Sequence, residues 1–240
     1  TEIYTLSLHD ALPICRLAVV KRTTVHREVS DIQAITAWAA AHYHLSSDPL
    51  SKYPKPRRDD EVIPPPTTGE IARILRHSPP HLARALRITY YTGVRPGRSE
   101  LLAIAWSQVD LYERTLFVIS AKKRGPVKRV VPISDPFLEL LRKWRSEDGP
   151  EVTHLVHYYG RPVRSLKTAF ARAKRLAGIT RRLTPYAFRH AFATTLLNHG
   201  ADLKSTSAML GHSREDTTIR IYQHTAIDVQ RAAVGKLPKI

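Results

Sequence analysis

The sequence LTPYAFRHAFATTLLNHGADLKSTSAMLGHSREDTTIRIYQHT occupies residues 183–225 and predicts three consecutive short helices. Thr184-Pro185 starts the first helix, which runs to about residue 198, because proline suits the first helical turn. Asp202 caps the second helix, which stops at Gly211, since glycine favours helix ends. The third helix carries Tyr222. Short helices with such boundaries indicate a mainly helical domain.

The chain upstream of this stretch predicts further helices and one pair of strands. Thr115–Ser120 and Val130–Ile133 are rich in β-branched and apolar residues and flank a turn of Lys, Arg, Gly and Pro. This pattern predicts a β-hairpin with a basic tip, where Lys128-Arg129, taken alone, is typical of solvated cations. We therefore expect a mainly α fold with a small antiparallel β-sheet. Helices are expected at 68–75, 79–93, 99–106, 135–146 and 165–177.

The N-terminal quarter of the chain divides into three segments. Residues 4–14, YTLSLHDALPI, resemble the translation of a sequencing adapter, so we expect a non-native segment at 1–14 and a gene that begins upstream. From Val25 to Leu45, apolar residues recur at helical spacing, which predicts a helix over 25–45. The charged, proline-rich segment 46–68 predicts a linker. We expect a domain boundary in this linker, which divides the remaining chain into 15–63 and 64–240.

The charge of the chain points to a polyanionic partner. Lys and Arg total 38 against 21 Asp and Glu, a formal net charge of +17. Nucleic acid is the leading candidate, because neutralised phosphates release counterions. An anionic membrane surface is the alternative, but no stretch approaches the ~18–20 apolar residues of a spanning helix. The single cysteine, Cys15, fits a reducing cytoplasm, and the 12 histidines form no metal-ligand pattern, so we expect neither metal nor cofactor.

Two arginines far apart in the chain, Arg95 and Arg189, occur with His212 and Tyr222 in an order that suits phosphodiester chemistry. Breaking a phosphodiester without a metal requires cations on the non-bridging oxygens, a nucleophile and an acid for the leaving oxygen. Arginine's planar fork gives two parallel hydrogen bonds to phosphate and keeps its charge. A tyrosine phenol, with a pKa of ~10 in isolation, can form a covalent phosphoryl-enzyme. The intermediate retains the bond energy, so rejoining needs no nucleotide.

Residues 91–111, YTGVRPGRSELLAIAWSQVDL, and the stretch at 183–225 together carry a resemblance to the tyrosine recombinases, or phage-type integrases. The first resembles the family's first arginine motif and the second its second block, a long ordered match that is more specific than a lone short motif. The resemblance covers 67–235 well. It covers 25–63 more weakly, as a remnant of the family's helical N-terminal DNA-binding domain. It implies site-specific DNA integration or excision through a 3′-phosphotyrosine intermediate.

The resemblance also implies roles for particular residues. Arg95 and Arg189 would be the two phosphate clamps, His212 would donate a hydrogen bond to the same phosphate, and Tyr222 would be the nucleophile. The family's lysine lies in the hairpin turn and protonates the leaving 5′ oxygen. Lys122 and Lys123 compete for that role. We favour Lys123, because Arg124-Gly125 follow it, close to the family's Lys-x-Gly turn.

Two departures from the family pattern concern the same site. Tyr186 stands where the family usually has His, three residues before the second arginine. Positions 186 and 189 share a helix face, so the phenol can hydrogen-bond the phosphate, although it is a poor general base at neutral pH. In addition, Pro96-Gly97-Arg98-Ser99 lengthens the gap between the first arginine and Glu100. The Thr-Gly-x-Arg context selects Arg95 rather than Arg98 as the clamp.

The family implies double-stranded DNA attachment sites as partner and a homo-tetramer on two duplexes, with residues 225–240 contacting a neighbour. Accessory DNA-bending proteins are candidate partners, and no membrane is expected. A protein of a phage or mobile element would act in the bacterial cytoplasm, at the nucleoid. Two alternatives stay open at this point. One is a catalytically impaired DNA-binding relict of an integrase, and the other is a type IB topoisomerase-like enzyme that relaxes supercoils without paired sites.

Overall fold

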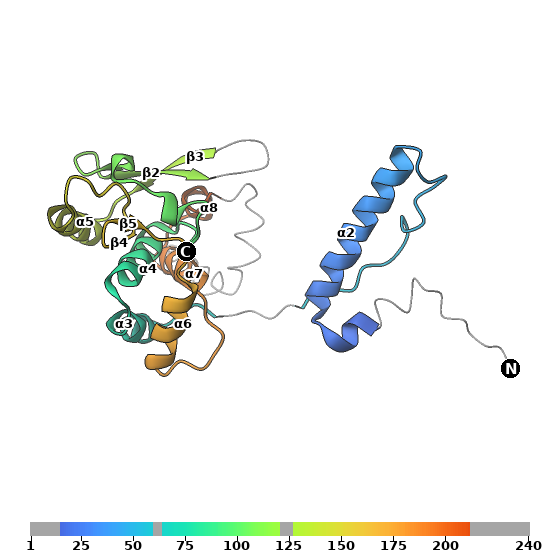
Figure 1. Cartoon of the computed structure of the whole chain (residues 1–240), viewed down its shortest axis with the longest axis horizontal. Coiled ribbons are helices and arrows are strands. Elements are labelled where there is room, and N and C mark those ends of the chain that lie inside the picture. The colour runs from blue at the N-terminus through green and yellow to red at the C-terminus, as the bar shows by residue number, and fades with distance from the viewer. Residues whose placement is uncertain (1–14, 60–63, 121–126, 212–240) are drawn as a thin grey trace, which may run out of the picture. The chain divides into compact units, whose positions relative to one another are not determined.

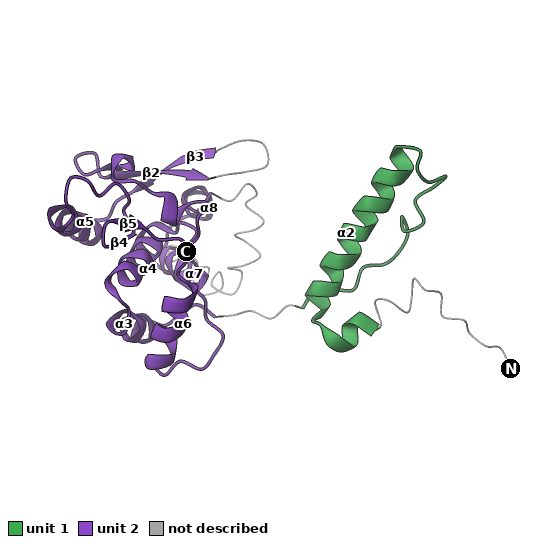
Figure 2. Ribbon diagram, viewed as in Figure 1, with its two compact units in different colours: residues 1–62 green, residues 63–240 purple. Residues whose placement is uncertain are grey.

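The computed structural model describes residues 15–59, 64–120 and 127–211. It divides the chain into two compact units, residues 1–62 and 63–240 (Figure 2). The adapter-like segment expected at 1–14 lies outside the described residues.

Unit 1 is built around one long helix, α2 (Arg22–Ala41) (Figure 1). The chain that follows runs back along this helix and is bonded to it. The side-chain amide of Gln33 donates to the carbonyl oxygens of Leu50 and Tyr53, both at 2.9 Å. Asp59 accepts hydrogen bonds from the amide and the hydroxyl of Thr23. Much of the segment predicted to be a linker therefore belongs to unit 1.

The predicted helix at 25–45 was wrong at its C-terminal end. The helix stops at Ala41, because Tyr43 adopts a φ of 60° and the amide of His44 donates back to the carbonyl of Ala39. Its buried residues are Val25 and Val29, whereas Ile35 is 66% exposed. Apolar spacing thus predicted the helix but not which of its turns would be covered.

Unit 2 begins with two helices whose boundaries follow their local signals. In α3 (Thr68–Arg76), Thr67 and Glu70 form a reciprocal capping box. α4 (Pro80–Thr92) has proline in its first turn and ends at Gly93, which adopts the left-handed conformation with a φ of 65°. Both helices were predicted, and the position of Gly93 determines where the chain leaves α4.

The predicted hairpin is confirmed and forms part of a three-stranded antiparallel sheet. β1 (Val109–Asp110), β2 (Thr115–Ser120) and β3 (Val127–Pro132) lie in that order. The register pairs Thr115 with Pro132 and Ser120 with Val127. Sequence reasoning missed β1 and a second small sheet of β4 (His157–Tyr158) and β5 (Arg161–Pro162), because strands of this length show no alternation.

Helices make up most of the remainder of unit 2. The single helix predicted at 99–106 was wrong, since two short 3₁₀ turns replace it, η1 (Leu101–Ala103) and η2 (Trp106–Gln108). The described elements confirm a mainly α fold with a small antiparallel sheet. The later helices are α5 (Asp135–Glu147), α6 (Lys167–Leu176), α7 (Tyr186–Asn198) and α8 (Leu203–Leu210).

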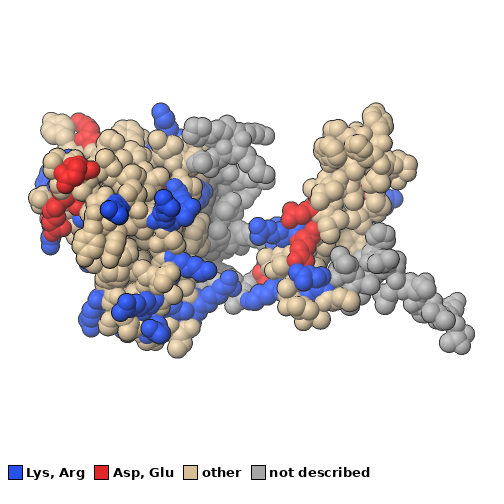
Figure 3. All heavy atoms as spheres, in the orientation of Figure 1, with Lys and Arg blue, Asp and Glu red and all other residues tan. Residues whose placement is uncertain are grey.

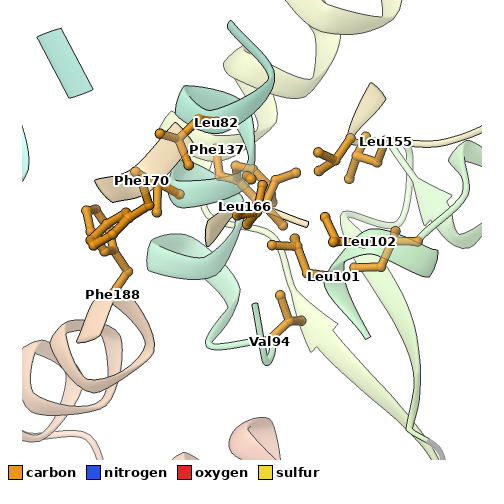
Figure 4. Packing of buried hydrophobic residues seen from close by; sticks show 14 of the residues in the cluster. Leu82, Val94, Leu101, Leu102, Phe137, Leu155, Leu166, Phe170 and Phe188 are labelled. Carbon is orange, nitrogen blue, oxygen red and sulfur yellow. The ribbon is translucent and has the colours of Figure 1, made fainter. Parts of the chain in front are cut away.

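The core of unit 2 lies where α4, α5, α6 and α7 meet, and its apolar side chains converge there (Figure 4). Phe137, Leu82 and Phe188 are fully buried in this cluster. A smaller cluster of Phe192, Leu197 and Leu210 joins α7 to α8. Since α4 packs against α7, the end of α4 is brought to the start of α7. Among the described residues, no helix combines the length and apolar composition needed to span a bilayer.

Candidate active site

Arg189 is the largest of the fully buried side chains, with 1% of its surface exposed. Its guanidinium donates to the carbonyl oxygen of Gly93 and, at 2.6 Å, to that of Leu210. These carbonyls lie at the C-terminal ends of α4 and α8, where the helix dipole favours a cation. Burial lowers the pKa of Arg189, and the charge of Arg95 acts in the same direction. The two arginines are therefore within electrostatic reach of each other.

Glycine is required at position 93 for two reasons. Its φ of 65° is a conformation that other residues rarely adopt, and a Cβ there would lie 2.5 Å from the ring of Phe192 and 3.0 Å from Leu210. The close approach of α4 to α7 and α8 thus depends on the absence of a side chain at Gly93. This packing brings the chain that leads to Arg95 next to Arg189.

Arg95 is held in place by Glu100. The backbone amide of Arg95 donates to one carboxylate oxygen of Glu100 at 3.0 Å, and its guanidinium forms an ion pair with the other oxygen. The side chain of Arg95 is 32% exposed, whereas that of Glu100 is 1% exposed. Glu100 is therefore buried, and it holds the partly exposed side chain of Arg95 through these two contacts.

Glu100 remains ionised because donors surround it. Burial alone would raise the pKa of Glu100, but hydrogen bonds from the guanidinium of Arg129, the amide of Arg95 and the hydroxyl of Ser120 bring it down to about 2. Arg129 and Ser120 belong to the two strands of the hairpin. The loop that carries Arg95 is thus bonded to the sheet through a charged carboxylate.

Tyr186 lies beside the two arginines. A depression of about 270 Å³ is lined by Arg95, Tyr186 and the residues 96–97 and 184–185. The Tyr186 ring lies 5.8 Å from the guanidinium carbon of Arg189 and is 38% exposed. The structure therefore brings together three of the predicted site residues: Arg95 and Tyr186 line one depression that opens to solvent, and Arg189 lies buried beside the Tyr186 ring.

The other predicted site residues cannot be placed in this way. Lys123 and its competitor Lys122, His212 and Tyr222 lie outside the described residues. The described chain ends at Gly211, directly before His212, and β2 and β3 flank the lysines in the sequence.

A basic groove adjoins the depression. It has a volume of about 840 Å³, and its apolar floor includes Phe170 and Leu183. It shares residues 96–97 and 184–185 with the depression, and no acidic side chain lines it in the described part of the chain. In unit 2, basic side chains gather over α3 and α6, and acidic ones toward α5 (Figure 3). The cations that line the groove are Arg98, Arg164, Lys167, Lys174 and Arg175.

Sequence reasoning missed the support behind Arg95. Glu100 was noticed only for its spacing, and Arg129 was interpreted as a solvated cation of the hairpin tip, which is wrong because its side chain is 9% exposed. The alternation of side chains along the strand could have revealed this. Arg129 is two residues from the apolar Val131, which faces the core, so both side chains point to the same face of the strand.

Comparison with known proteins defines the class. The family model of the phage integrase family matches residues 67–228. The chain is 29% identical over 218 residues to tyrosine recombinase XerD of Staphylococcus saprophyticus, covering 83% of this chain and 71% of that protein. It is 30% identical over 223 residues to tyrosine recombinase XerC of Corynebacterium glutamicum, covering 85% and 68%.

Solved structures show the same fold. An integrase fragment of the transposon Tn1549, in complex with a circular intermediate DNA, has a TM-score of 0.74 at 18% identity and covers 96% of this chain and 84% of that one. A lambda integrase fragment, a dimer bound to a COC′ core site, has a TM-score of 0.72 at 20% identity and covers 86% and 78%. The fold is that of the tyrosine recombinase catalytic domain.

The chain belongs to the phage integrase family. It is a tyrosine recombinase, and its activity is site-specific DNA recombination. The comparisons do not favour the topoisomerase-like or relict alternatives.

Proposed function

We propose that this chain cuts and rejoins DNA strands at attachment sites, with one phosphodiester held between Arg95 and Arg189 and attacked by Tyr222. The observation that carries the proposal is the proximity of two arginines from segments far apart in the sequence: buried Arg189 is bonded to the carbonyl oxygen of Gly93, two residues before Arg95, which lines the depression. Guanidinium groups preorganised in a partly buried site stabilise developing negative charge without reorganisation.

The two arginines supply different parts of the phosphate clamp. Arg189 is rigid, since it is buried and bonded to Gly93 and Leu210. Arg95 is partly exposed and is oriented by Glu100. A buried cation acts through a lower effective dielectric than an exposed one, so its attraction for a phosphate is stronger. Both positive charges then stabilise the negative charge that develops on the non-bridging oxygens of the phosphate.

The covalent step assigns one role to each remaining predicted residue. The phenol of Tyr222 releases its proton to water, its oxygen forms a bond to phosphorus, and the bond from phosphorus to the 5′ oxygen breaks. Lys123 gives its proton to that leaving oxygen, and His212 donates a hydrogen bond to the phosphate. A 3′-phosphotyrosine remains, and attack by a 5′ hydroxyl reverses the sequence. No cofactor takes part in this scheme.

Tyr186 is proposed as a hydrogen-bond donor to the phosphate. Its ring lies over the guanidinium of Arg189 and its side chain lines the depression. A phenol donates a hydrogen bond at neutral pH but does not accept a proton readily there. Substrate binding, rather than proton transfer, is thus the role that its position supports.

Double-stranded DNA is the proposed partner, and the basic groove along α6 is its proposed path away from the reacting phosphate. The groove adjoins the depression. Three of its cations, Lys167, Lys174 and Arg175, lie along α6. Residues 64–240 would form the catalytic domain, and residues 15–63 the remnant of a DNA-binding domain. The segment 1–14 would be non-native.

The assembly is proposed to be a homo-tetramer on two duplexes, with residues 225–240 contacting a neighbour and DNA-bending proteins as accessory partners. The site of action would be the bacterial cytoplasm, at the nucleoid. Light scattering of the chain with paired sites distinguishes a tetrameric complex from a dimer on one duplex.

A nicked suicide substrate tests the activity. Nicked duplexes with a randomised core trap covalent adducts, which are recovered after denaturation and sequenced. We expect adducts with the wild-type chain and none with Tyr222→Phe. Tyr159→Phe, at a tyrosine that is 87% exposed on the β4–β5 turn, is the matched control and should behave as wild type.

The alternatives give different results in this assay and in a relaxation assay on supercoiled DNA. Sequence-selective DNA binding without any adduct would indicate a relict and would contradict the proposal. Relaxation of supercoiled DNA that carries no attachment site would indicate a topoisomerase-like activity instead.

A further inference from the structure

Arg129 connects three separate segments of unit 2. It lies on β3, and its side chain is 9% exposed. Its three guanidinium nitrogens each have a different acceptor. Nη2 donates to Glu100 at 2.7 Å, Nη1 to the hydroxyl of Ser120 at 2.6 Å, and Nε to the carbonyl oxygen of Met209 at 2.9 Å.

The first contact leads to Arg95. The carboxylate of Glu100 accepts hydrogen bonds from the amide and the guanidinium of Arg95, from Arg129, and at 2.7 Å from the hydroxyl of Ser120. Both carboxylate oxygens are thus fully used, so Glu100 cannot shift without breaking several charge-assisted bonds. Arg129 and the backbone amide of Arg95 donate to the same carboxylate oxygen of Glu100.

The third contact leads to the end of α8. Arg129 and Arg189 hold consecutive carbonyl oxygens there, those of Met209 and Leu210. Gly211 follows with a φ of 67°, and a Cβ at that position would lie 2.9 Å from Nη1 of Arg129. The guanidinium therefore occupies the space that a side chain at Gly211 would take.

We propose that Arg129 is a positioning residue for the cleavage site, which sets the orientation of Arg95 through Glu100 relative to the end of α8 that Arg189 also holds. The inference rests on the proposed function. Arg129 is assigned no phosphate contact, because it acts on the site through the groups that its nitrogens contact, Glu100, Ser120 and the carbonyl of Met209. Lysine cannot replace it, because an ammonium lacks the planar fork that reaches three acceptors at once.

The test compares Arg129→Lys with Arg84→Lys in the full chain. Arg84 is a similarly buried arginine, with 11% of its side chain exposed, which pairs with Asp148 at 2.8 Å and contacts neither Arg95 nor Glu100. The probe is one nicked duplex, chosen from those that formed adducts in the randomised library. For each variant we would measure the Kd for this duplex and the melting temperature of the protein. We would also measure the single-turnover rate of adduct formation in the saturated complex.

A positioning role predicts a separation between binding and cleavage. Arg129→Lys should lower the rate in the saturated complex on the order of 10²-fold, as displacements of about 1 Å do at reacting centres, with little change in Kd. Arg84→Lys should lower the melting temperature and leave that rate unchanged. A wild-type rate in saturated Arg129→Lys overturns the inference, and so does a loss confined to Kd.

Hydrogen exchange separates this inference from the proposed function. The amide of Arg95 is bonded to Glu100, so Arg129→Gln should speed its exchange and that of the last turn of α8, whereas Arg84→Gln should not. If the wild-type chain forms no adduct, the proposed function fails and exchange alone decides the role of Arg129. Unchanged exchange in both segments overturns the inference.

Discussion

Arg189 donates a hydrogen bond to the carbonyl oxygen of Gly93, across 96 positions of the chain. Gly93 ends α4, and Arg95 follows on the loop that leaves it. A buried cation is therefore bonded to the backbone that carries the second, partly exposed cation. The spacing of the two proposed phosphate clamps is thus set by a contact inside the protein, before any DNA is bound.

Replacing Arg189 tests the buried clamp. Arg189→Lys keeps the charge but loses the fork that holds Gly93 and Leu210. We expect the single-turnover rate of adduct formation to fall on the order of 10²–10³-fold, as on removal of one donor to a developing charge. DNA binding should fall less, because the groove cations remain. Arg73→Lys, exposed on α3, is the control. A nearly wild-type rate for Arg189→Lys would contradict the assignment.

Replacing Gly93 tests the packing that brings the arginines together. Gly93→Ala requires a strained φ and places a methyl group 2.5 Å from Phe192. We expect a loss of about 1–3 kcal/mol in the free energy of unfolding by urea, together with reduced cleavage. Gly97→Ala is the matched control, since a Cβ there meets nothing within 4 Å. Equal stability of the two variants would show that the close approach is unimportant.

The free energy of unfolding of unit 2 should depend on pH because of the lowered pKa of Glu100. Its folded-state pKa is about 2, below the ordinary value of 4.5. A carboxyl with a lowered pKa stabilises the fold fully above pH 4.5, and that contribution is lost as the pH falls toward 2. Urea titrations across this range should show the free energy of unfolding decreasing.

Glu100→Gln should flatten that dependence. At neutral pH it leaves Arg129 buried without its carboxylate, which costs about 3–5 kcal/mol. The difference from wild type should then shrink as the pH falls. Glu70, whose hydrogen bond from Arg181 brings its pKa to about 2, titrates in both proteins and does not affect the comparison. Parallel stability curves for the two proteins would rule out this role for Glu100.

The groove should contribute to DNA binding through charge. Arg175→Ala is expected to weaken binding to unrelated duplexes about equally and to reduce the slope of log affinity against log salt by about 1. Gel-shift titrations at several salt concentrations measure this. Arg142→Ala, exposed on α5 toward the acidic end of unit 2, should leave the slope unchanged. A slope that is insensitive to Arg175 would place the DNA elsewhere.

Much of the fold of unit 2 could be predicted because its signals are local. Proline in the first turn of α4, glycine at its end and Asp202 at the start of α8 act within a few residues of themselves. The hairpin followed from β-branched runs around a polar turn. Boundaries failed where the local signal was weak, as at Ala41 and in the 3₁₀ turns after Glu100.

The candidate residues Arg95, Tyr186 and Arg189 were identified from motif order, which carries no distances. Their convergence requires α4 to pack against α7, and that depends on Phe192 facing a glycine. The part played by Arg129 was hidden for a similar reason. Lys128 and Arg129 are neighbours with the same charge, but in the paired register Arg129 lies opposite Val118 on the covered face. Strand pairing determines which of the two is buried, and pairing is a property of the folded chain.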